Sequence, residues 1–278
     1  PPRSTLFPYT TLFRSPAGQL DALAANLPQS LLLTGSDGIG LLTAAKYVAG
    51  DAAAIIQPTD KDGNVSASGS IKLDSILQLR QQSRGRAAGR MVFIIDDADR
   101  MNHRAQNAFL KLLEEPAPQI HFILTSHAPH LLLATILSRV ERLRIKQISP
   151  EQTQQLLQQL KISDPQIEQQ LLFLASGKPA VLARLAKNPP ELEKIGQIVR
   201  DAQQFIRAAG YERAVIAARY TDRSNALQFL SHCLTILSNN LRRNPSRELI
   251  RQSEQIAETY QRIAANGNVR LQLIALAV

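Results

Sequence analysis

The strongest constraint on the fold is an apolar run, 30–34, followed by a loop with glycines in phosphate-binding spacing, 35–42. Strand, glycine-rich loop and helix form such a site when a lysine and then a serine or threonine follow the last glycine. Here those positions hold Leu41 and Leu42. Lys46 cannot replace the lysine, because it lies roughly 7.5 Å further along the expected helix and about 140° around it. We therefore expect a nucleotide-binding fold whose own loop has lost its phosphate and magnesium ligands.

Composition excludes several classes of protein. The chain has 278 residues, a formal net charge of +9 and one cysteine, Cys233. A single cysteine excludes a disulfide framework and a cysteine-based zinc site. No apolar stretch approaches the roughly 20 residues that span a bilayer. The basic balance is compatible with nucleic acid without requiring it, and we expect a cytoplasmic protein with no membrane partner.

The two ends of the sequence are set apart from the fold. Thr5–Ser15 resembles the in-frame translation of a sequencing-adapter oligonucleotide, including an internal echo of Thr-Leu-Phe. We therefore interpret residues 1–15 as adapter-derived and expect native sequence from Pro16; the alternative is a genuine extended arm. The last residues, 271–278, form an apolar run that stops abruptly, which suggests that this end is clipped as well.

The first half of the chain alternates between strand and helix patterns. Met91–Ile95 and Phe122–Thr125 are apolar runs typical of strands buried on both faces of a parallel sheet. Weaker strands are predicted at 54–57 and 141–145, and an apolar stripe predicts a helix over 102–113. This alternation predicts right-handed βαβ units and a parallel sheet.

The pattern becomes entirely helical at residues 149–152, Ser-Pro-Glu-Gln, which have the signature of a helix capping box. Pro189-Pro190 marks a second boundary. We therefore predict an α/β domain at 16–149, a small helical domain at 150–188 and a second helical domain at 190–278.

Two acids, Asp96 and Asp97, directly follow the strand predicted at 91–95. In nucleotide-dependent motors, the first acid at such a strand end holds Mg²⁺ and the second, usually glutamate, orients the attacking water. Asp97 is one methylene shorter than glutamate, which weakens the case for hydrolysis. With Leu41 and Leu42 in the loop, we favour the alternative that these acids only cap the helix that follows.

Four segments occur in unbroken order along the chain: Ile94–Met101, Ala105–Pro116, Phe122–Ser126 and Thr135–Arg139. Together they closely resemble the clamp-loader branch of AAA+ proteins, the loader subunits of bacterial DNA polymerase III. Leu-Leu-Glu-Glu-Pro together with the later Ser-Arg is far more specific than the glycine loop alone. The resemblance implies an AAA+ nucleotide-fold domain, a small helical lid and an all-α collar domain through which subunits assemble.

The resemblance also assigns positions in the nucleotide site. Leu41 and Leu42 replace the Walker A lysine and threonine, and Ala180 replaces the arginine of the second sensor. Three of four ATP-facing groups are therefore missing, and we expect only a vestigial site. Its members are Gly35, Gly38 and Gly40 in the loop, Asp96 and Asp97 as Walker B acids, and Ser126, beside Thr125, as the polar sensor.

Arg139, in the Ser-Arg pair, matches the family's arginine finger, which reaches the ATP of a neighbouring subunit in trans. Val140 stands where the family has cysteine, which leaves the guanidinium in place. A subunit that only completes its neighbour's site needs no lysine in its own loop, but it does need Arg139. The alternative is an Arg139 that pairs with Glu141 or caps a helix of its own subunit.

Arg100 and Arg104 are the candidates for DNA contact. They flank the start of the helix after Walker B, whose N-terminal end faces primer–template DNA in the family, and the helix amides there add to anion binding. Two histidines, His127 and His130, have no third ligand spaced to join them, so we predict no metal site. A second basic cluster is as compatible with a solvated surface as with phosphate contact: Arg80, Arg84, Arg86 and Arg90.

The helices after residue 190 are the predicted assembly surface. They carry more apolar stripe than a domain of this size should leave in water, with ordinary internal packing as the alternative. The stripe comprises Ala226, Phe229, Leu230, Cys233, Leu234 and Leu237.

Taken with the residues, the resemblance implies a non-hydrolysing loader subunit that is not an enzyme by itself. It would need no cofactor of its own, since ATP and Mg²⁺ are bound in the neighbouring subunit. The expected partners are the gamma/tau ATPase and delta subunits, primer–template DNA and, indirectly, the sliding clamp. Two alternatives remain: an active gamma/tau-like ATPase subunit, against which Leu41, Leu42 and Ala180 speak, and a free-standing DNA-binding adaptor on an AAA+ scaffold.

Overall fold

A computed structural model describes residues 17–50, 53–66, 69–83, 90–115, 119–162, 164–175 and 177–277, so the segment interpreted as adapter-derived, 1–15, lies outside it. The chain forms two compact units, one running to Lys187 and the other beginning at Asn188. The finer division into nucleotide-fold domain, lid and collar stays a prediction. Among the described helices, none has the length and hydrophobicity of a membrane-spanning segment.

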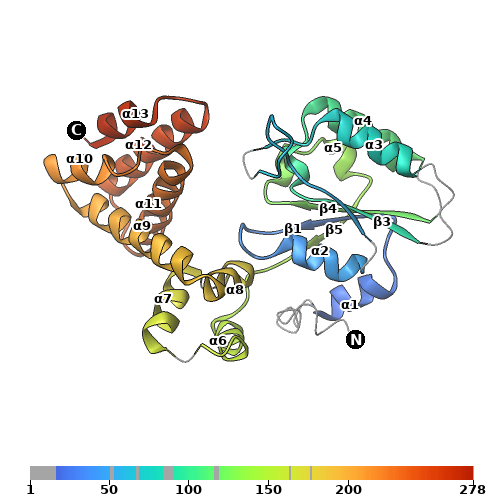
Figure 1. Cartoon of the computed structure of the whole chain (residues 1–278), viewed down its shortest axis with the longest axis horizontal. Coiled ribbons are helices and arrows are strands. Elements are labelled where there is room, and N and C mark those ends of the chain that lie inside the picture. Colours follow the sequence, from blue (N-terminus) through green and yellow to red (C-terminus); the bar gives the residue numbers. More distant parts are fainter. Residues whose placement is uncertain are drawn as a thin grey trace. The chain divides into compact units, whose positions relative to one another are not determined.

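The first unit is built on a five-stranded parallel sheet with the order β2-β3-β4-β1-β5 (Figure 1). This confirms the α/β fold with a parallel sheet that the alternating pattern predicted. The order places the end of β1 beside the ends of β4 and β5, and β3 beside β4. The strands are β1 (Ser30–Thr34), β2 (Ala54–Ile56), β3 (Met91–Ile95), β4 (Ile120–Ser126) and β5 (Glu141–Arg144).

Helices cover both faces of this sheet: α1 and α2 lie on one face, and α3, α4 and α5 on the other (Figure 1). Three further helices, α6, α7 and α8, follow the sheet within the same unit. The helices are α1 (Ala17–Ala25), α2 (Leu41–Ala49), α3 (Leu73–Ser83), α4 (His103–Glu114), α5 (Ala134–Leu137), α6 (Pro150–Gln159), α7 (Pro165–Ala175) and α8 (Pro179–Lys187), with 3₁₀ turns η3 (Ala98–Arg100) and η4 (Pro129–Leu131).

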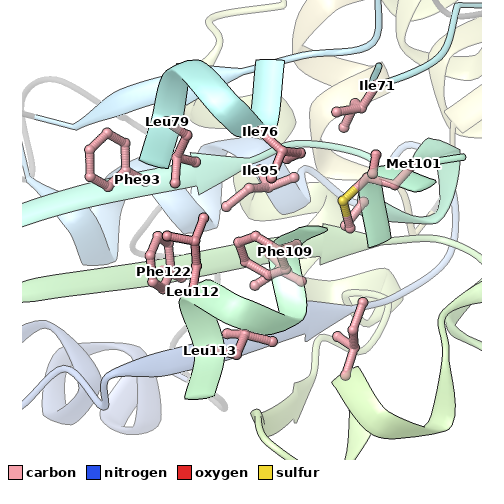
Figure 2. Close-up of a cluster of buried hydrophobic side chains, with 14 of the residues drawn as sticks. Ile71, Ile76, Leu79, Phe93, Ile95, Met101, Phe109, Leu112, Leu113 and Phe122 are labelled. Atoms are coloured by element: carbon pink, nitrogen blue, oxygen red, sulfur yellow. The ribbon is translucent and has the colours of Figure 1, made fainter. Parts of the chain in front are cut away.

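Alternate residues of the central strands feed two separate hydrophobic cores, because successive side chains of a strand point to opposite faces. Phe93 and Phe122 pack with α3 and α4, and Phe109 of α4 meets Phe122 edge-on at 5.3 Å between ring centroids (Figure 2). Val92 and Ile123 point into the other core, beneath α1 and α2. Burial on both faces explains why these strands read as continuous apolar runs.

Two helix starts have the side-chain caps that their sequence indicates. Asn102 accepts a hydrogen bond from Ala105 N at 2.9 Å and so begins α4. Ser149 and Gln152 form the predicted reciprocal capping box at the start of α6. These caps satisfy backbone N–H groups that would otherwise have no partner within the helix.

The second unit is all helical and surrounds a core of its own. The apolar stripe expected to form an assembly surface lies mostly in this core: five of its members are 0% exposed, and Leu234 packs against them. The stripe is therefore internal packing, the alternative considered from the sequence, because an apolar stripe does not reveal whether its own domain or a partner covers it. Assembly through the helices after residue 190 stays a prediction. The helices are α9 (Pro189–Arg207), α10 (Tyr211–Ala217), α11 (Arg223–Arg243), α12 (Arg247–Ala264) and α13 (Val269–Ala277).

A buried carboxylate organises one side of this core. Asp201 is 4% exposed and accepts hydrogen bonds from Tyr220 Oη at 2.8 Å, Arg219 Nη1 at 3.0 Å and Gln197 Nε2 at 2.8 Å. Burial, followed by the hydrogen bond to Asp201, raises the pKa of the Tyr220 hydroxyl. Burial also raises the pKa of the Cys233 thiol to about 12, in keeping with a core cysteine.

We predict that Asp201→Ala lowers the free energy of unfolding by about 2 kcal/mol, because it leaves the buried Tyr220 hydroxyl without its acceptor. Urea denaturation followed by circular dichroism measures the change. Glu254→Ala, at an exposed position of α12, is the control and should cost less than about 0.5 kcal/mol. Equal losses in the two variants would contradict the assignment.

Candidate functional site

The glycine loop between β1 and α2 turns through two left-handed glycines. Gly38 and Gly40 have φ angles of 81° and 93°, in the left-handed region that glycine adopts without strain. Leu41 begins α2, is 2% exposed and packs in the core beneath α1 and α2. Leu42 is partly buried against the same core. The two positions that would supply a lysine and a hydroxyl therefore carry apolar side chains directed into the protein.

Helix α8 closes directly over this loop. Gly38 O accepts a hydrogen bond from Val181 N at 3.4 Å. A Cβ atom on Gly38 would lie 2.5 Å from a Val181 methyl group, and one on Gly40 would lie 3.2 Å from Ala180 Cβ. Ala180, at the position of the second sensor, thus meets the loop through van der Waals contact and brings no charge to it.

The two acids after β3 are joined to β4 by one hydroxyl. Thr125 Oγ1 donates to Asp96 Oδ1 at 2.8 Å and accepts from Asp97 N at 2.9 Å. Gln57 Nε2, just beyond β2, donates to Asp96 Oδ2 at 3.1 Å. Both oxygens of Asp96 therefore have partners within the chain. The sequence did not predict this contact of Gln57. The only signal for it was the place of Gln57 at the end of a strand parallel to β3.

The two residues predicted as the polar sensor make different contacts. Thr125, not Ser126, contacts the acids; Ser126 is fully buried, and its Oγ accepts a hydrogen bond from Ala128 N at 3.2 Å. The acids themselves do not cap α4, because Asn102 does so. The favoured interpretation of Asp96 and Asp97 as caps of that helix is therefore wrong.

His127 connects the acids to the glycine loop. Its Nδ1 donates to Gly35 O at 3.0 Å, and its Nε2 lies 3.7 Å from Asp97 Oδ1. Its backbone N–H donates to Asp99 Oδ1 at 3.2 Å. Asp97 has a left-handed backbone with a φ of 49°, and burial, then the neighbouring charge of Asp96, raise the pKa of its carboxyl. The sequence analysis considered His127 only as a metal ligand, whereas the structure gives it a linking position.

Metal ligands do not gather here. Within the described ranges, no group of three histidine, cysteine, aspartate or glutamate side chains is arranged to hold a metal ion. His130 lies exposed in η4.

Arg139 lies just after α5 and meets the end of α4. Its Nη2 is 3.0 Å from Glu114 Oε1, and its Nη1 donates to Thr135 O at 3.0 Å. The side chain keeps 37% of its surface exposed. Glu114 belongs to the Leu-Leu-Glu-Glu-Pro run, so the two most specific motifs of the sequence meet at this pair. The partner is Glu114 rather than the Glu141 considered from the sequence.

A buried glutamine fixes the segment that leads to Arg139. Gln106 of α4 is 5% exposed; its Nε2 donates to Leu131 O at 3.2 Å, and its Oε1 accepts from Leu133 N at 2.8 Å. Ile136 of α5 is fully buried against the same side of the sheet. The position of Arg139 therefore follows from packing between α4 and α5, which no local sequence pattern predicts.

The arginines proposed for DNA contact lie near the start of α4. Arg100 Nε is 3.9 Å from Asp97 Oδ2, and Arg104 is exposed in the first turn of the helix. Arg90 is exposed before β3, and the backbone of Arg80 belongs to α3. The other members of the second basic cluster, 84 and 86, lie outside the described residues.

Comparison with known proteins gives matches to the replication machinery. Residues 51–149 match the family model described as DNA polymerase III, delta subunit. DNA polymerase III subunit delta' of Pseudomonas aeruginosa is 35% identical over 124 residues, which are 43% of this chain and 36% of the relative. The Bacillus subtilis subunit of the same name is 29% identical over 133 residues, 47% of this chain and 40% of the relative. The aligned segments thus span well under two thirds of these relatives.

A solved structure shows the same fold over most of the chain. The gamma subunit-related protein of DNA polymerase III from Thermotoga maritima superposes with a TM-score of 0.62 at 20% identity, covering 93% of this chain and 97% of that one. At 20% identity this likeness shows a shared fold. In sequence, the chain is similar to the delta-prime subunits of bacterial DNA polymerase III over the matched segments.

Proposed function

We propose that this chain serves as the delta-prime subunit of a replicative clamp loader, which does not hydrolyse ATP itself but completes the ATP site of a neighbouring ATPase subunit. One observation carries the proposal. The residue at the lysine position, Leu41, is buried in the core, whereas Arg139 remains partly exposed beyond α5. The lysine and hydroxyl needed in cis are absent, while the arginine needed in trans is present.

Hydrolysis in cis is disfavoured on electrostatic grounds. The triphosphate carries several negative charges, which a lysine and Mg²⁺ neutralise in active loops. Leu41, Leu42 and Ala180 supply neither charge nor metal ligand. The backbone N–H groups of the loop alone would have to hold the phosphates, and α8 already packs against Gly38 and Gly40.

Arg139 has the chemistry needed for action in trans. Its planar guanidinium can make paired hydrogen bonds to phosphate oxygens as charge develops during transfer. To do so it must leave Glu114, and the pair is cheap to break because both side chains are substantially exposed, 37% and 51%. In the absence of a neighbour's ATP, Glu114 would hold the arginine in place.

The proposed partners follow from this role. They are the loader's gamma/tau ATPase and delta subunits, the sliding clamp indirectly, and primer–template DNA through Arg100 and Arg104. The chain would act in the cytoplasm with no nucleotide cofactor of its own. Gel filtration with the ATPase and delta subunits tests this role. A free-standing DNA-binding adaptor would form a complex with neither subunit.

We predict that the isolated chain shows no saturable binding of fluorescent ATP with Mg²⁺ at concentrations up to about 1 mM, a weak-binding limit of roughly 4 kcal/mol. Fluorescence anisotropy measures it, with the loader's ATPase subunit as the positive control. Micromolar binding would mean that backbone amides and Asp96 suffice, and an active ATPase subunit would become the better interpretation.

Arg139→Ala should slow ATP hydrolysis at the one neighbouring site by about 10³-fold or more, as expected when a sole arginine finger is removed. Total DNA-stimulated ATPase of the reconstituted loader should fall partly, and clamp loading should fall further. Arg142→Ala is the matched control, since Arg142 is an exposed arginine on β5 that donates to Leu137 O. Unchanged ATPase and loading in an intact Arg139→Ala assembly would refute the finger role.

Glu114→Gln should raise the neighbour's ATPase by up to about fivefold at subsaturating ATP, because an exposed ion pair of at most about 1 kcal/mol no longer competes for Arg139. Steady-state ATPase of the reconstituted loader measures the effect. Glu115→Gln, at the next exposed position, is the control and should have no effect. A loss of activity in Glu114→Gln would show instead that the glutamate orients the arginine productively.

A further inference from the structure

A polar pocket of about 350 Å³ opens in the second unit between α10, α12 and α13. Its walls contain three arginines, two glutamates and several glutamines. This volume is at the small end of the range for ligand sites, roughly 300–1,000 Å³. The charged residues of the lining are Arg213, Arg251, Arg262, Glu248 and Glu258.

The charges of the pocket do not cancel. Arg262 is paired with Glu258 at 2.6 Å, which leaves Arg213 and Arg251 against Glu248 and gives the lining one excess positive charge. A bound anion with a single negative charge would neutralise this excess. A phosphate dianion would meet two carboxylates in the wall and carry more charge than the arginines can match.

Arg213 is the least satisfied cation of the pocket. Its Nε is buried and has no hydrogen-bond partner within the described residues. Its guanidinium carbon lies 4.5 Å from the ring centroid of Phe205, an arrangement that covers one face of the cation only. Burial lowers the pKa of Arg213, although neighbouring groups, including Glu248, raise it. A buried donor without a partner is costly, so an oxyanion in this pocket would be stabilised by hydrogen bonds to the guanidinium.

Exposed apolar side chains lie on one of the helices that line the pocket. On α13, Leu271 is 66% exposed and Ile274 39%. Gln272 and Ala275, next to these residues in α13, line the pocket. Apolar surface beside a charged pocket favours a protein segment over a free small acid.

We propose that this pocket receives a single aspartate or glutamate side chain from a partner protein, whose apolar residues cover the exposed side chains of α13. The carboxylate accepts hydrogen bonds from Arg213 and Arg251, while the glutamines of the wall can hold the remaining lone pairs. The pocket belongs to the second unit and the glycine loop to the first, and the pocket does not depend on the proposed loader function.

The test uses the full chain and two short fluorescein-labelled peptides, blocked at both ends, with leucines around one central glutamate or glutamine. Fluorescence anisotropy should show that the glutamate peptide binds about tenfold more tightly, the difference expected for charge-assisted hydrogen bonds. Inorganic phosphate and glutarate serve as competitors and should displace the peptide only weakly.

Three variants locate the binding site. Arg213→Gln should abolish the difference between the two peptides. Glu248→Gln should tighten binding of the glutamate peptide several-fold, because it removes a repelling charge without removing the contact between Arg213 and Phe205. Arg243→Gln, an exposed arginine at the end of α11 outside the pocket lining, should change nothing.

Several results would overturn the proposal. They are equal or absent binding of the two peptides, stronger binding of phosphate than of the glutamate peptide, and an unchanged affinity in Glu248→Gln. The Glu248 variant keeps the test decisive if Arg213→Gln disturbs packing on Phe205. Failure here would leave the loader proposal untouched, because no step of the experiment involves a loader subunit.

Discussion

The parallel pairing of β1, β3 and β4 is the constraint on which the site depends. It brings the carboxyl ends of these strands to one edge of the sheet, with Thr34 opposite Ser126 and Ile95 opposite Leu124. Because the next residues of β3 and β4 then lie side by side, Asp96 and Thr125 meet at 2.8 Å. The glycine loop leaves β1 at the same edge, which places Gly35 within reach of His127.

Contacts within the protein itself already involve many of the groups at this edge of the sheet. His127 ties the loop to the acids, and α8 contacts the loop through Val181 and Ala180. In an active site of this fold, a lysine, a hydroxyl and a metal ion would serve the phosphates instead. On the proposed function, these internal contacts hold the nucleotide fold in one arrangement without a bound nucleotide, and Arg139 acts on the ATP of the neighbouring subunit.

The sequence predicts the framework because its signals are local. Continuous apolar runs identify β3 and β4, and the Ser149 capping box marks the change from the alternating α/β pattern to helices alone. The glycine spacing predicts the loop, and the motifs carry the resemblance to the clamp-loader subunits. Each of these depends on residues that are neighbours in the chain or share one helical or strand period.

What the sequence misses depends on partners far apart in the chain. Gln57 reaches Asp96 through strand register, and Glu114 reaches Arg139 through packing of α4 against α5. Neither contact can be predicted from the spacing of these residues along the sequence. The apolar stripe of α11 was assigned to assembly because its pattern is the same whether its own domain or a partner covers it. The buried Nε of Arg213, which has no hydrogen-bond partner among the described residues, likewise becomes visible only when burial and pairing are known.

The central claim is that this chain lacks a nucleotide of its own and completes its neighbour's. Cryo-electron microscopy of the reconstituted loader with a non-hydrolysable ATP analogue tests both halves together. The account predicts density for the analogue in the adjacent ATPase subunit, with Arg139 released from Glu114 and within hydrogen-bond distance of the γ-phosphate, and no nucleotide at the loop 35–42. Nucleotide in that loop, or an Arg139 still paired with Glu114 beside an occupied neighbouring site, would contradict it.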